Sequence, residues 1–270
     1  MALHMDIRVL SFTGSTRTGK LVQKAAADSN LKNVICELGG KSPAIIFEDA
    51  DLENAVRETE FSINFHSGQT CMANSRIYVQ NTIADKFLSA FKIACEARKL
   101  GDPTDGLTNN GPQADVSQYR MVTNYIEKGK STGRMILGDQ TSAKENFVSP
   151  VIFIEQPDHS IINREEIFGP VVVIHTFETE DEAINRANDS EYGLYAAVYT
   201  KDIDRAMRVM TKLESGIVGI NCTSPTVAPD APIGGYKQSG YGRESHIHSM
   251  DHYLETKSVL IKVAANTVTN

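Results

Sequence analysis

The residue best suited to chemistry in this sequence is Cys71, which ends the glycine-led segment Gly68–Cys71. A second unusual segment, Glu37–Pro43, starts with a carboxylate and continues through two adjacent glycines. A thiolate is a strong nucleophile and a carboxylate can activate water, so the two segments predict a nucleophile and a general base. Because two negative charges in one pocket repel each other, we expect Glu37 to stand away from the thiol. Taken alone, Cys71 would also fit a small buried packing residue.

Five short segments follow one another along the chain. They are Phe12–Gly19 (FTGSTRTG), Glu37–Pro43 (ELGGKSP), Gly68–Cys71 (GQTC), Glu165–Pro170 (EEIFGP) and Gly234–Glu244 (GGYKQSGYGRE). In their order and spacing they resemble the NAD(P)-dependent aldehyde dehydrogenase family, and the resemblance covers nearly the whole chain. It implies an α/β fold of aldehyde dehydrogenase type, with a doubly wound catalytic domain and a remnant of the Rossmann-like cofactor domain.

The resemblance implies a reaction for the nucleophile and the base. Cys71 matches the family's nucleophile, which forms a thiohemiacetal with an aldehyde, loses hydride to the nicotinamide and is left as a thioester. Glu37 matches the general base that activates water to hydrolyse the thioester to a carboxylic acid. Glu244 lies where the family places an acidic residue in a proton relay behind the base.

The resemblance also implies a site for NAD or NADP. Gly14 and Ser15 match the turn that meets the phosphates of the cofactor. Leu38 lies where the backbone faces the nicotinamide carboxamide. Glu166 matches the carboxylate that holds the nicotinamide ribose hydroxyls, and Phe168 matches the aromatic side chain beside the ring.

The residues around that turn predict an anion site independently. Ile7–Phe12 is a β-branched and apolar run typical of a strand, and Leu21–Ala27 has the alanine-rich character of a helix start. Free N–H groups and the helix dipole favour phosphate at such a junction. With only Gly14 and Gly19, the segment is not the G-x-G-x-x-G fingerprint, so plain turn chemistry stays open on these residues alone.

Four residues are expected to shape the substrate tunnel. Thr70 and Met72 flank the nucleophile, and Ile233 stands where the family usually has Phe. Val227 aligns near an upstream aromatic residue of the tunnel entrance. We therefore expect an aliphatic, adaptable tunnel rather than an aromatic one, and a branched or bulky apolar carbonyl substrate.

Enzymes of this family are longer than the 270 residues of this chain, and the match begins at its first residues. We therefore expect the N-terminal half to be absent, and with it most of the cofactor sheet, an oxyanion-hole asparagine and an oligomerisation hairpin. Three origins stay open: a fragment, one half of an assembly, or a shortened natural protein. In the last, Cys71 would act without a cofactor as an isomerase or hydrolase on an unsaturated carbonyl compound or an ester, or the chain would be inert.

Composition limits the partners. The 27 Lys and Arg residues against 34 Asp and Glu residues give a net charge of −7 without a basic run, which argues against nucleic acid. Four scattered cysteines suggest neither a disulfide framework nor a metal pair, and a cytoplasmic location fits best. No apolar stretch is long enough for a membrane span. His246, His248 and His252 predict an exposed helix rather than a metal site, and His66 is a minor candidate for a dyad with Cys71.

Apolar runs and helical periods alternate along the chain, which predicts an α/β fold. We expect a remnant of the NAD(P)-binding domain at residues 1–38, a catalytic domain at residues 39–238, and a C-terminal helix with an oligomerisation strand at residues 239–270. The expected strands are Ala44–Phe47, Ile77–Val79, Val171–Ile174, Ala196–Tyr199 and Ser258–Val263. The expected helices are Leu52–Phe65, Ile83–Arg98 and Val116–Gly129, with two more beginning near Glu180 and Asp202. The resemblance implies a homodimer.

Overall fold

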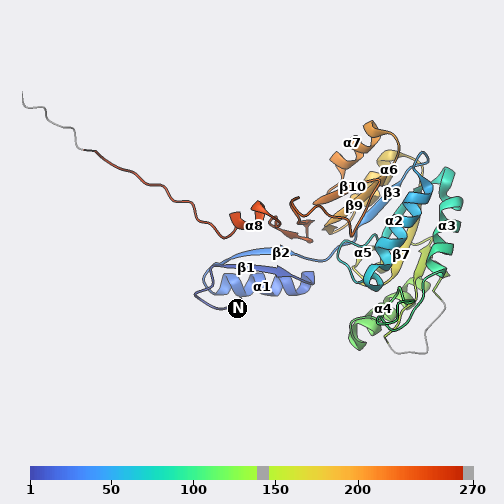
Figure 1. The fold of residues 1–270 in the computed structure, drawn as a ribbon, viewed down its shortest axis with the longest axis horizontal. Coiled ribbons are helices and arrows are strands. Elements are labelled where there is room, and N and C mark those ends of the chain that lie inside the picture. Colours follow the sequence, from blue (N-terminus) through green and yellow to red (C-terminus); the bar gives the residue numbers. More distant parts are fainter. Residues whose placement is uncertain (139–145, 264–270) are drawn as a thin grey trace, which may run out of the picture.

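A seven-stranded sheet forms the centre of the larger layer in the computed structural model, which describes residues 1–138 and 146–263 (Figure 1). The strand order is β10-β9-β3-β4-β7-β6-β5. The strands are β3 (Pro43–Ile46), β4 (Arg76–Gln80), β5 (Arg134–Leu137), β6 (Val151–Ile154), β7 (Val171–Phe177), β9 (Tyr195–Tyr199) and β10 (Ile217–Ile220). All neighbours pair in parallel except β5, which is antiparallel to β6.

Helices cover both faces of this sheet. On one face lie α2 (Leu52–Asn64) and α3 (Ala84–Glu96); on the other lie α4 (Val116–Lys130), α5 (Ile161–Arg164), α6 (Glu180–Asn188) and α7 (Ile203–Lys212). Side chains alternate between the faces, so Ile77 and Val79 of β4 pack with the first pair of helices while Tyr78 packs with the opposite group. The fold is the predicted doubly wound α/β arrangement.

Most expected elements of this layer are present, with boundaries that differ by a few residues. Short polar side chains begin several helices as the sequence suggests. Asp51 accepts a hydrogen bond from the backbone N–H of Asn54 at 3.1 Å, and Asp202 accepts one from the N–H of Arg205 at 3.1 Å. These caps position the helix starts at the carboxyl ends of the strands.

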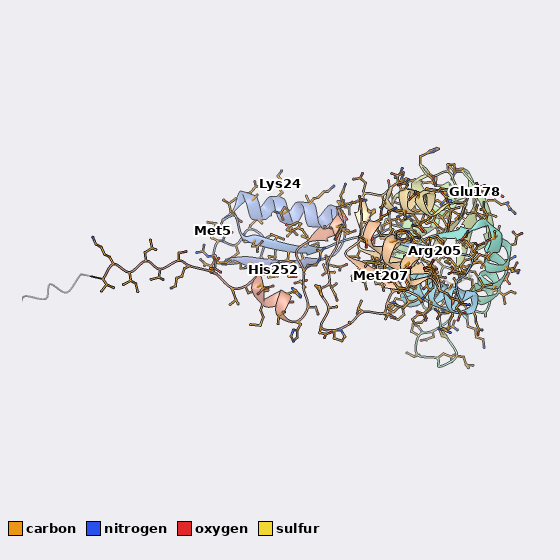
Figure 2. The ribbon with its side chains drawn as sticks, turned by 90° about the horizontal axis from the view of Figure 1, so that it is seen from above. Met5, Lys24, Glu178, Arg205, Met207 and His252 are labelled. Carbon is orange, nitrogen blue, oxygen red and sulfur yellow. The ribbon has the colours of Figure 1, made fainter. Side chains whose placement is uncertain are left out.

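A smaller sheet lies beside the larger layer (Figures 1 and 2). It contains β1 (Val9–Thr13), β2 (Asn33–Glu37) and β12 (Gly240–Tyr241), with α1 (Thr16–Asp28) packed on β2 through Ala26, Val34, Cys36 and Leu38. β1 and β2 are parallel, and β12 is antiparallel to β2. This sheet therefore joins the start of the chain to residues beyond position 238, across the boundary expected from the sequence.

Several short elements complete the fold. They are the 3₁₀ turns η1 (Phe65–Gly68) and η2 (Asn81–Ile83), the paired strands β8 (Tyr192–Gly193) and β11 (Tyr236–Lys237), and helix α8 (Ile247–Asp251). The expected oligomerisation strand Ser258–Val263 pairs with no strand of the described residues: the segment is extended and exposed, and it points away from both layers (Figures 1 and 2). A strand needs a backbone partner, and no described residue of the chain supplies one. Within the described ranges no helix is both long and apolar enough to cross a bilayer.

Phe91 and Ile93 of α3 provide a matched test of this packing. Phe91 is fully buried against the sheet, whereas Ile93 is 67% exposed. Phe91→Ala should lower the free energy of unfolding by about 3–5 kcal/mol because it leaves a cavity. Ile93→Ala should change it by no more than about 0.5 kcal/mol. Urea unfolding measures both, and similar losses would contradict the assignment of α3 faces.

Candidate active site

Cys71 lies in the loop between α2 and β4, directly after the strained turn η1. His66, Ser67 and Gly68 all have positive φ angles, of 49°, 57° and 75°. A Cβ atom on Gly68 would meet the backbone carbon of Gly169 at 2.1 Å, so only glycine fits there. A hydrogen bond from Ser67 Oγ to the carbonyl of Gly111 at 2.7 Å stabilises the turn.

A buried polar network braces the other side of this loop. Ser224 Oγ donates to the carbonyl of Met72 at 2.7 Å, and Ser62 Oγ accepts from the N–H of Asn74 at 3.1 Å. Thr223 Oγ1 donates to Asn74 Oδ1 at 2.6 Å. Sequence reasoning missed Ser62, Thr223 and Ser224, because isolated hydroxyl residues carry no local signal of the loop that they will contact.

The Gly39–Gly40 pair lies between the loop that carries Cys71 and the acidic segment Glu165–Glu166. A Cβ atom on Gly40 would lie 2.1 Å from the carbonyl oxygen of Cys71, and one on Gly39 would lie 2.3 Å from Glu166 Oε2. The N–H of Gly40 donates to Glu166 Oε1 at 3.0 Å. Both glycines are therefore required by close approach rather than by turn geometry. Ser239 supports the pair from behind, since its Oγ donates to the carbonyl of Gly39 at 2.6 Å.

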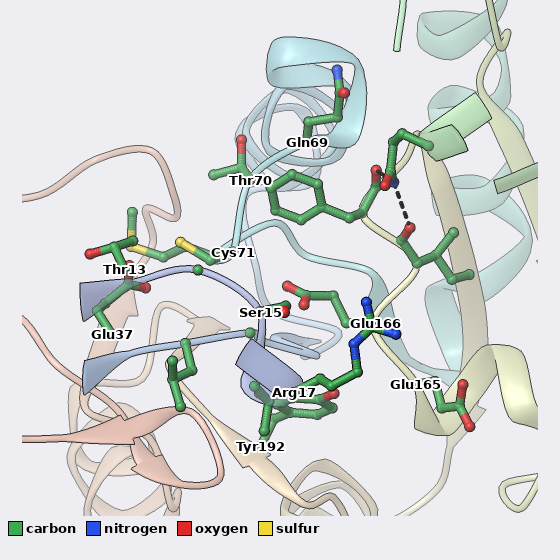
Figure 3. A pocket seen from close by; sticks show the side chains of 18 of the residues that line it. Thr13, Ser15, Arg17, Glu37, Gln69, Thr70, Cys71, Glu165, Glu166 and Tyr192 are labelled. Atoms are coloured by element: carbon green, nitrogen blue, oxygen red, sulfur yellow. Dashed lines mark hydrogen bonds between the residues drawn. The ribbon is translucent and has the colours of Figure 1, made fainter. Parts of the chain in front are cut away.

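These segments enclose a cavity of about 940 Å³ (Figure 3). Nine of the twelve residues expected to form the site line it: Gly14, Ser15, Glu37, Leu38, Thr70, Cys71, Met72, Glu166 and Phe168. They come from the α1 turn, the end of β2, the loop after η1 and the loop after α5. Cys71 is partly exposed and lines this cavity, in contrast to the fully buried Cys36 and Cys95.

Three expected site residues lie outside the lining. Val227 lies in an exposed loop, and its neighbour in the lining is Pro225. Ile233 is paired through its backbone with Glu244, with N–H to carbonyl distances of 2.9 Å in both directions. Glu244 stands behind the cavity wall, where Ser11 Oγ donates to its Oε1 at 2.7 Å.

Aromatic side chains form part of the cavity wall. Phe65, Tyr125, Phe168 and Tyr192 all line it, whereas the expected aliphatic character of the substrate tunnel was inferred from Val227 and Ile233. The sequence comparison at Val227 and Ile233 could not show this, because those two residues lie outside the lining. Tyr125 hydrogen bonds through its hydroxyl to Glu165, which joins α4 to the acidic segment.

Burial and acidic neighbours shape the electrostatics of Cys71. Burial raises the pKa of the thiol, and the negative charge of nearby Glu37 raises the pKa further; the charge of Glu166 adds to this. Glu37 therefore lies close enough to the sulfur for its charge to affect the ionisation of the thiol. The reason is that Glu37 ends β2 at the edge of the same cavity that the Cys71 loop borders.

Glu37 itself also has a raised pKa. Burial is the main cause of the rise, the neighbouring Cys71 thiol opposes it, and the nearby charge of Glu244 adds to it. A carboxyl group with a raised pKa takes up a proton from water more readily than an ordinary carboxylate. The arrangement can support nucleophilic attack by sulfur and proton transfer at the same carbonyl carbon.

Glu166 faces the cavity as a buried acceptor. Burial raises the pKa of Glu166 to about 7, while the Gly40 N–H and the charge of Lys41 oppose the rise and the charge of Glu37 adds to it. Phe168 follows with a φ of 58°, and its carbonyl accepts from Gln118 Nε2 at 2.7 Å. Gln118 of α4 was not expected from the sequence, because a glutamine on a helix face carries no specific signal.

The start of α1 forms the remaining wall. Ser15 caps the helix by accepting from the N–H of Thr18 at 3.2 Å, and the first turn carries Arg17 but no acidic residue. Such a terminus favours anions. For metal ions, residues 1–138 and 146–263 contain no group of three or more His, Cys, Asp or Glu side chains that could act as ligands.

Comparisons with known proteins agree with this geometry. A model of the aldehyde dehydrogenase family matches residues 1–259. Mitochondrial aldehyde dehydrogenase of Mesocricetus auratus is 43% identical over 265 residues, which covers 97% of this chain and 53% of the relative. Aldehyde dehydrogenase 1A1 of Oryctolagus cuniculus is 43% identical over 263 residues, with 97% and 53% covered. The chain thus spans about half the length of the curated relatives it matches.

Solved structures show the same similarity. The indole-3-acetaldehyde dehydrogenase of P. syringae, in complex with NAD+, has a TM-score of 0.94 and 40% identity, with 97% of this chain and 54% of that chain covered. The betaine aldehyde dehydrogenase of Staphylococcus aureus, in complex with NAD+, has a TM-score of 0.93 and 40% identity, with 100% of this chain and 55% of that chain covered. At this identity the likeness extends to sequence as well as fold.

The charge of Glu37 near Cys71 predicts a change in thiol reactivity. Glu37→Gln removes a negative charge beside the sulfur, so the thiol pKa should fall and more thiolate should form at neutral pH. Alkylation of Cys71 by iodoacetamide should then be faster, by about tenfold for each pH unit that the pKa falls. Mass spectrometry follows the labelling, with Cys71→Ala to identify the site.

Glu244→Gln is the matched control, because Glu244 acts on Glu37 rather than directly on the sulfur. It should change the rate less than Glu37→Gln does. Slower labelling in Glu37→Gln would show that the carboxylate activates the thiol instead of suppressing its ionisation.

Proposed function

The chain belongs to the aldehyde dehydrogenase family, and from that membership we propose that its cavity oxidises an aldehyde to a carboxylic acid with NAD or NADP. The observation that carries the proposal is the convergence of Cys71, Glu37 and Glu166 on one solvent-accessible cavity. These are a nucleophile, a base and an acceptor for sugar hydroxyls.

The cavity residues fit a dinucleotide. The start of α1, with Ser15 and Arg17 and no acidic residue in its first turn, suits the phosphates. Glu166 would accept hydrogen bonds from the nicotinamide ribose, Phe168 would pack beside the ring, and Leu38 would lie at the carboxamide. When bound, the cofactor supplies the acceptor for the hydride that leaves the substrate carbon.

The chain's own residues would carry the remaining steps. The Cys71 sulfur bonds to the aldehyde carbon, and the thiol proton passes to the carbonyl oxygen to give a thiohemiacetal. Loss of hydride and of that proton leaves a thioester on Cys71. Glu37 then takes a proton from water as the water oxygen attacks the thioester, and the carboxylic acid leaves with the free thiol restored. Glu244, with Ser11, stands behind Glu37 to receive the proton.

The substrate class follows from the wall near the sulfur. Met72, Met121, Phe65 and Phe168 line the cavity, and Thr70 is the small polar residue beside the nucleophile. An apolar aldehyde fits such a wall better than a charged one. Methionine side chains adapt to irregular shapes, which supports a branched or bulky chain.

The proposal includes a homodimer in the cytoplasm. Residues 254–263 extend away from the fold with exposed apolar side chains at Val259, Leu260, Ile261 and Val263, a surface that a second copy would bury. All four cysteines are free thiols, in keeping with a reducing compartment. The Mesocricetus auratus relative is named as a mitochondrial enzyme. Cell fractionation would show whether this chain is found in the cytoplasm or in mitochondria.

An assay of cofactor reduction tests the main proposal. The purified chain is incubated with a panel of apolar aldehydes and NAD or NADP, and absorbance of the reduced cofactor is followed. Cys71→Ala should abolish the signal. Glu166→Gln should weaken cofactor binding by about 1.5–3 kcal/mol, since it removes hydrogen bonds to a charged acceptor. The neighbouring Glu165→Gln is the control and should have a smaller effect on the KM for NAD.

Two outcomes would reject this function. One is no cofactor reduction together with turnover of an ester or an enone that depends on Cys71, which would favour a cofactor-independent thiol hydrolase or isomerase. The other is no turnover in either assay, which would favour an inert chain.

Sedimentation tests the dimer. Leu260→Lys and Ile261→Lys place charges on the exposed tail and should convert a dimer into a monomer in analytical ultracentrifugation, because buried unpaired charges are costly. His248→Ala on the nearby helix α8 serves as a control for changes outside the tail. A wild-type chain that sediments as a monomer contradicts this part of the proposal.

A further inference from the structure

Lys41 is the most deeply buried cation near the cavity. It is 1% exposed, and within the described residues its Nζ makes no hydrogen bond. A buried ammonium group without hydrogen bonds costs several kcal/mol unless an opposite charge offsets the loss of water. The mechanism above uses no property of Lys41, so its position needs a separate explanation.

The nearest cation makes the position of Lys41 less favourable. Arg76 of β4 is also 1% exposed, and its Nε donates to the carbonyl of Lys41 at 2.9 Å. Its other nitrogens donate to the carbonyls of Arg186 at 3.2 Å and Ala187 at 2.9 Å, at the carboxyl end of α6. Carbonyl oxygens and the helix dipole therefore stabilise Arg76, and no ion pair within residues 1–138 and 146–263 neutralises it. Its positive charge repels an ammonium group on Lys41.

The opposite charge comes from the acidic segment. Lys41 directly follows Gly40, whose N–H holds Glu166 Oε1 at 3.0 Å, and Gly39 packs against the other carboxylate oxygen. Lys41 thus belongs to the same short stretch of backbone that fixes the Glu166 carboxylate. The charges of Glu166 and, less strongly, of Glu165 favour the ammonium form of Lys41.

We propose that Lys41 is a positioning residue: a buried cation, next in the chain to the Gly40 N–H that holds Glu166, which keeps the Glu166 carboxylate ionised. Its value for cofactor binding rests on the proposed function, in which Glu166 accepts hydrogen bonds from ribose hydroxyls. The coupling of Lys41 to Glu166 is a property of the fold alone.

The electrostatic surroundings support this assignment. Burial and the charge of Arg76 together lower the pKa of Lys41 to about 7, against the opposing pull of Glu166 and Glu165. Burial raises the pKa of Glu166 to about the same value. Two buried groups that titrate together share their protons, so the charge on one depends on the charge on the other.

Other charged groups around Glu166 are placed less favourably to do this. Glu37 and the Cys71 thiol face it across the cavity, and Glu37 raises its pKa. Tyr192 borders the same wall. Arg17 points toward Glu166 in Figure 3, but its side chain is exposed, so water and salt screen its charge.

The sign of the effect follows from this arrangement. Without the Lys41 charge, Glu166 loses an attraction that favours its ionised form, and its pKa rises. A larger fraction of Glu166 is then protonated at neutral pH. The protonated carboxyl group has fewer lone pairs that can accept hydrogen bonds from the ribose hydroxyls. Binding that depends on Glu166 should weaken at neutral pH and recover as the pH increases.

Carboxyl ¹³C NMR of the full chain, labelled at glutamate, measures the coupling directly. Glu166→Gln assigns the Glu166 signal. Lys41→Gln and Lys41→Met should each raise the titration midpoint of Glu166 by about 1–3 pH units. Lys41→Arg should restore most of the wild-type value if it folds. Arg17→Met, which removes an exposed cation on the same wall, should change the midpoint much less.

An unchanged midpoint in folded Lys41→Gln and Lys41→Met would overturn the proposal. So would a shift in Arg17→Met as large as the shift in Lys41→Gln. Circular dichroism and thermal unfolding check that each variant is folded. A structural role for Lys41 alone would lower the melting temperature without moving the Glu166 titration.

A second measurement separates the coupling from the proposed function. NAD binding is followed by calorimetry from about pH 6 to about pH 9. In Lys41→Gln the binding curve should shift toward higher pH, and Lys41→Arg should reverse the shift. If wild-type protein binds no NAD at any pH, the proposed function fails, while the NMR result still supports or overturns the coupling of Lys41 to Glu166.

Discussion

The close approach of the Gly39–Gly40 backbone to two other segments is the constraint on which the cavity depends. One glycine packs on the Glu166 carboxylate and the other on the carbonyl of Cys71. A side chain at either position would separate the nucleophile from the acidic segment. Because β2 leads into this pair and β3 follows it, the crossing between the small and large sheets brings Glu37 to the edge of the same cavity.

This crowding has an electrostatic consequence. Glu37, Glu166 and Cys71 can all carry negative charge, and burial raises the pKa of each group. The charge of Glu37 adds to the rise at Cys71 and Glu166, and the charge of Glu244 adds to the rise at Glu37. At Glu166, the N–H of Gly40 and the charge of buried Lys41 oppose that rise. The cavity therefore holds proton-bearing groups near neutral pH, which suits a reaction in which a thiol, a water molecule and a carboxyl group exchange protons.

Support for the cavity comes from distant parts of the chain. Ser239 fixes Gly39 from the segment that also contributes β12, and Ser224 fixes the loop of the nucleophile. Arg76 donates hydrogen bonds both to the carbonyl of Lys41 and to the carbonyl of Ala187 at the end of α6. These buried hydrogen bonds join residues that are far apart in sequence. The placement of the Cys71 sulfur therefore depends on both the larger layer and the smaller sheet.

The sequence alone determined the family resemblance, the α/β class, most strands and helices, and nine residues of the cavity, because glycine-rich motifs and hydrophobic periods are local signals. Tertiary structure decided the rest. Glu37 and Cys71 border one cavity since the end of β2 faces that loop, Ile233 pairs with Glu244 outside the lining, and Ser258–Val263 pairs with no strand of the described residues. Each of these depends on which backbone segments meet in space, a long-range contact that no local pattern of residues records.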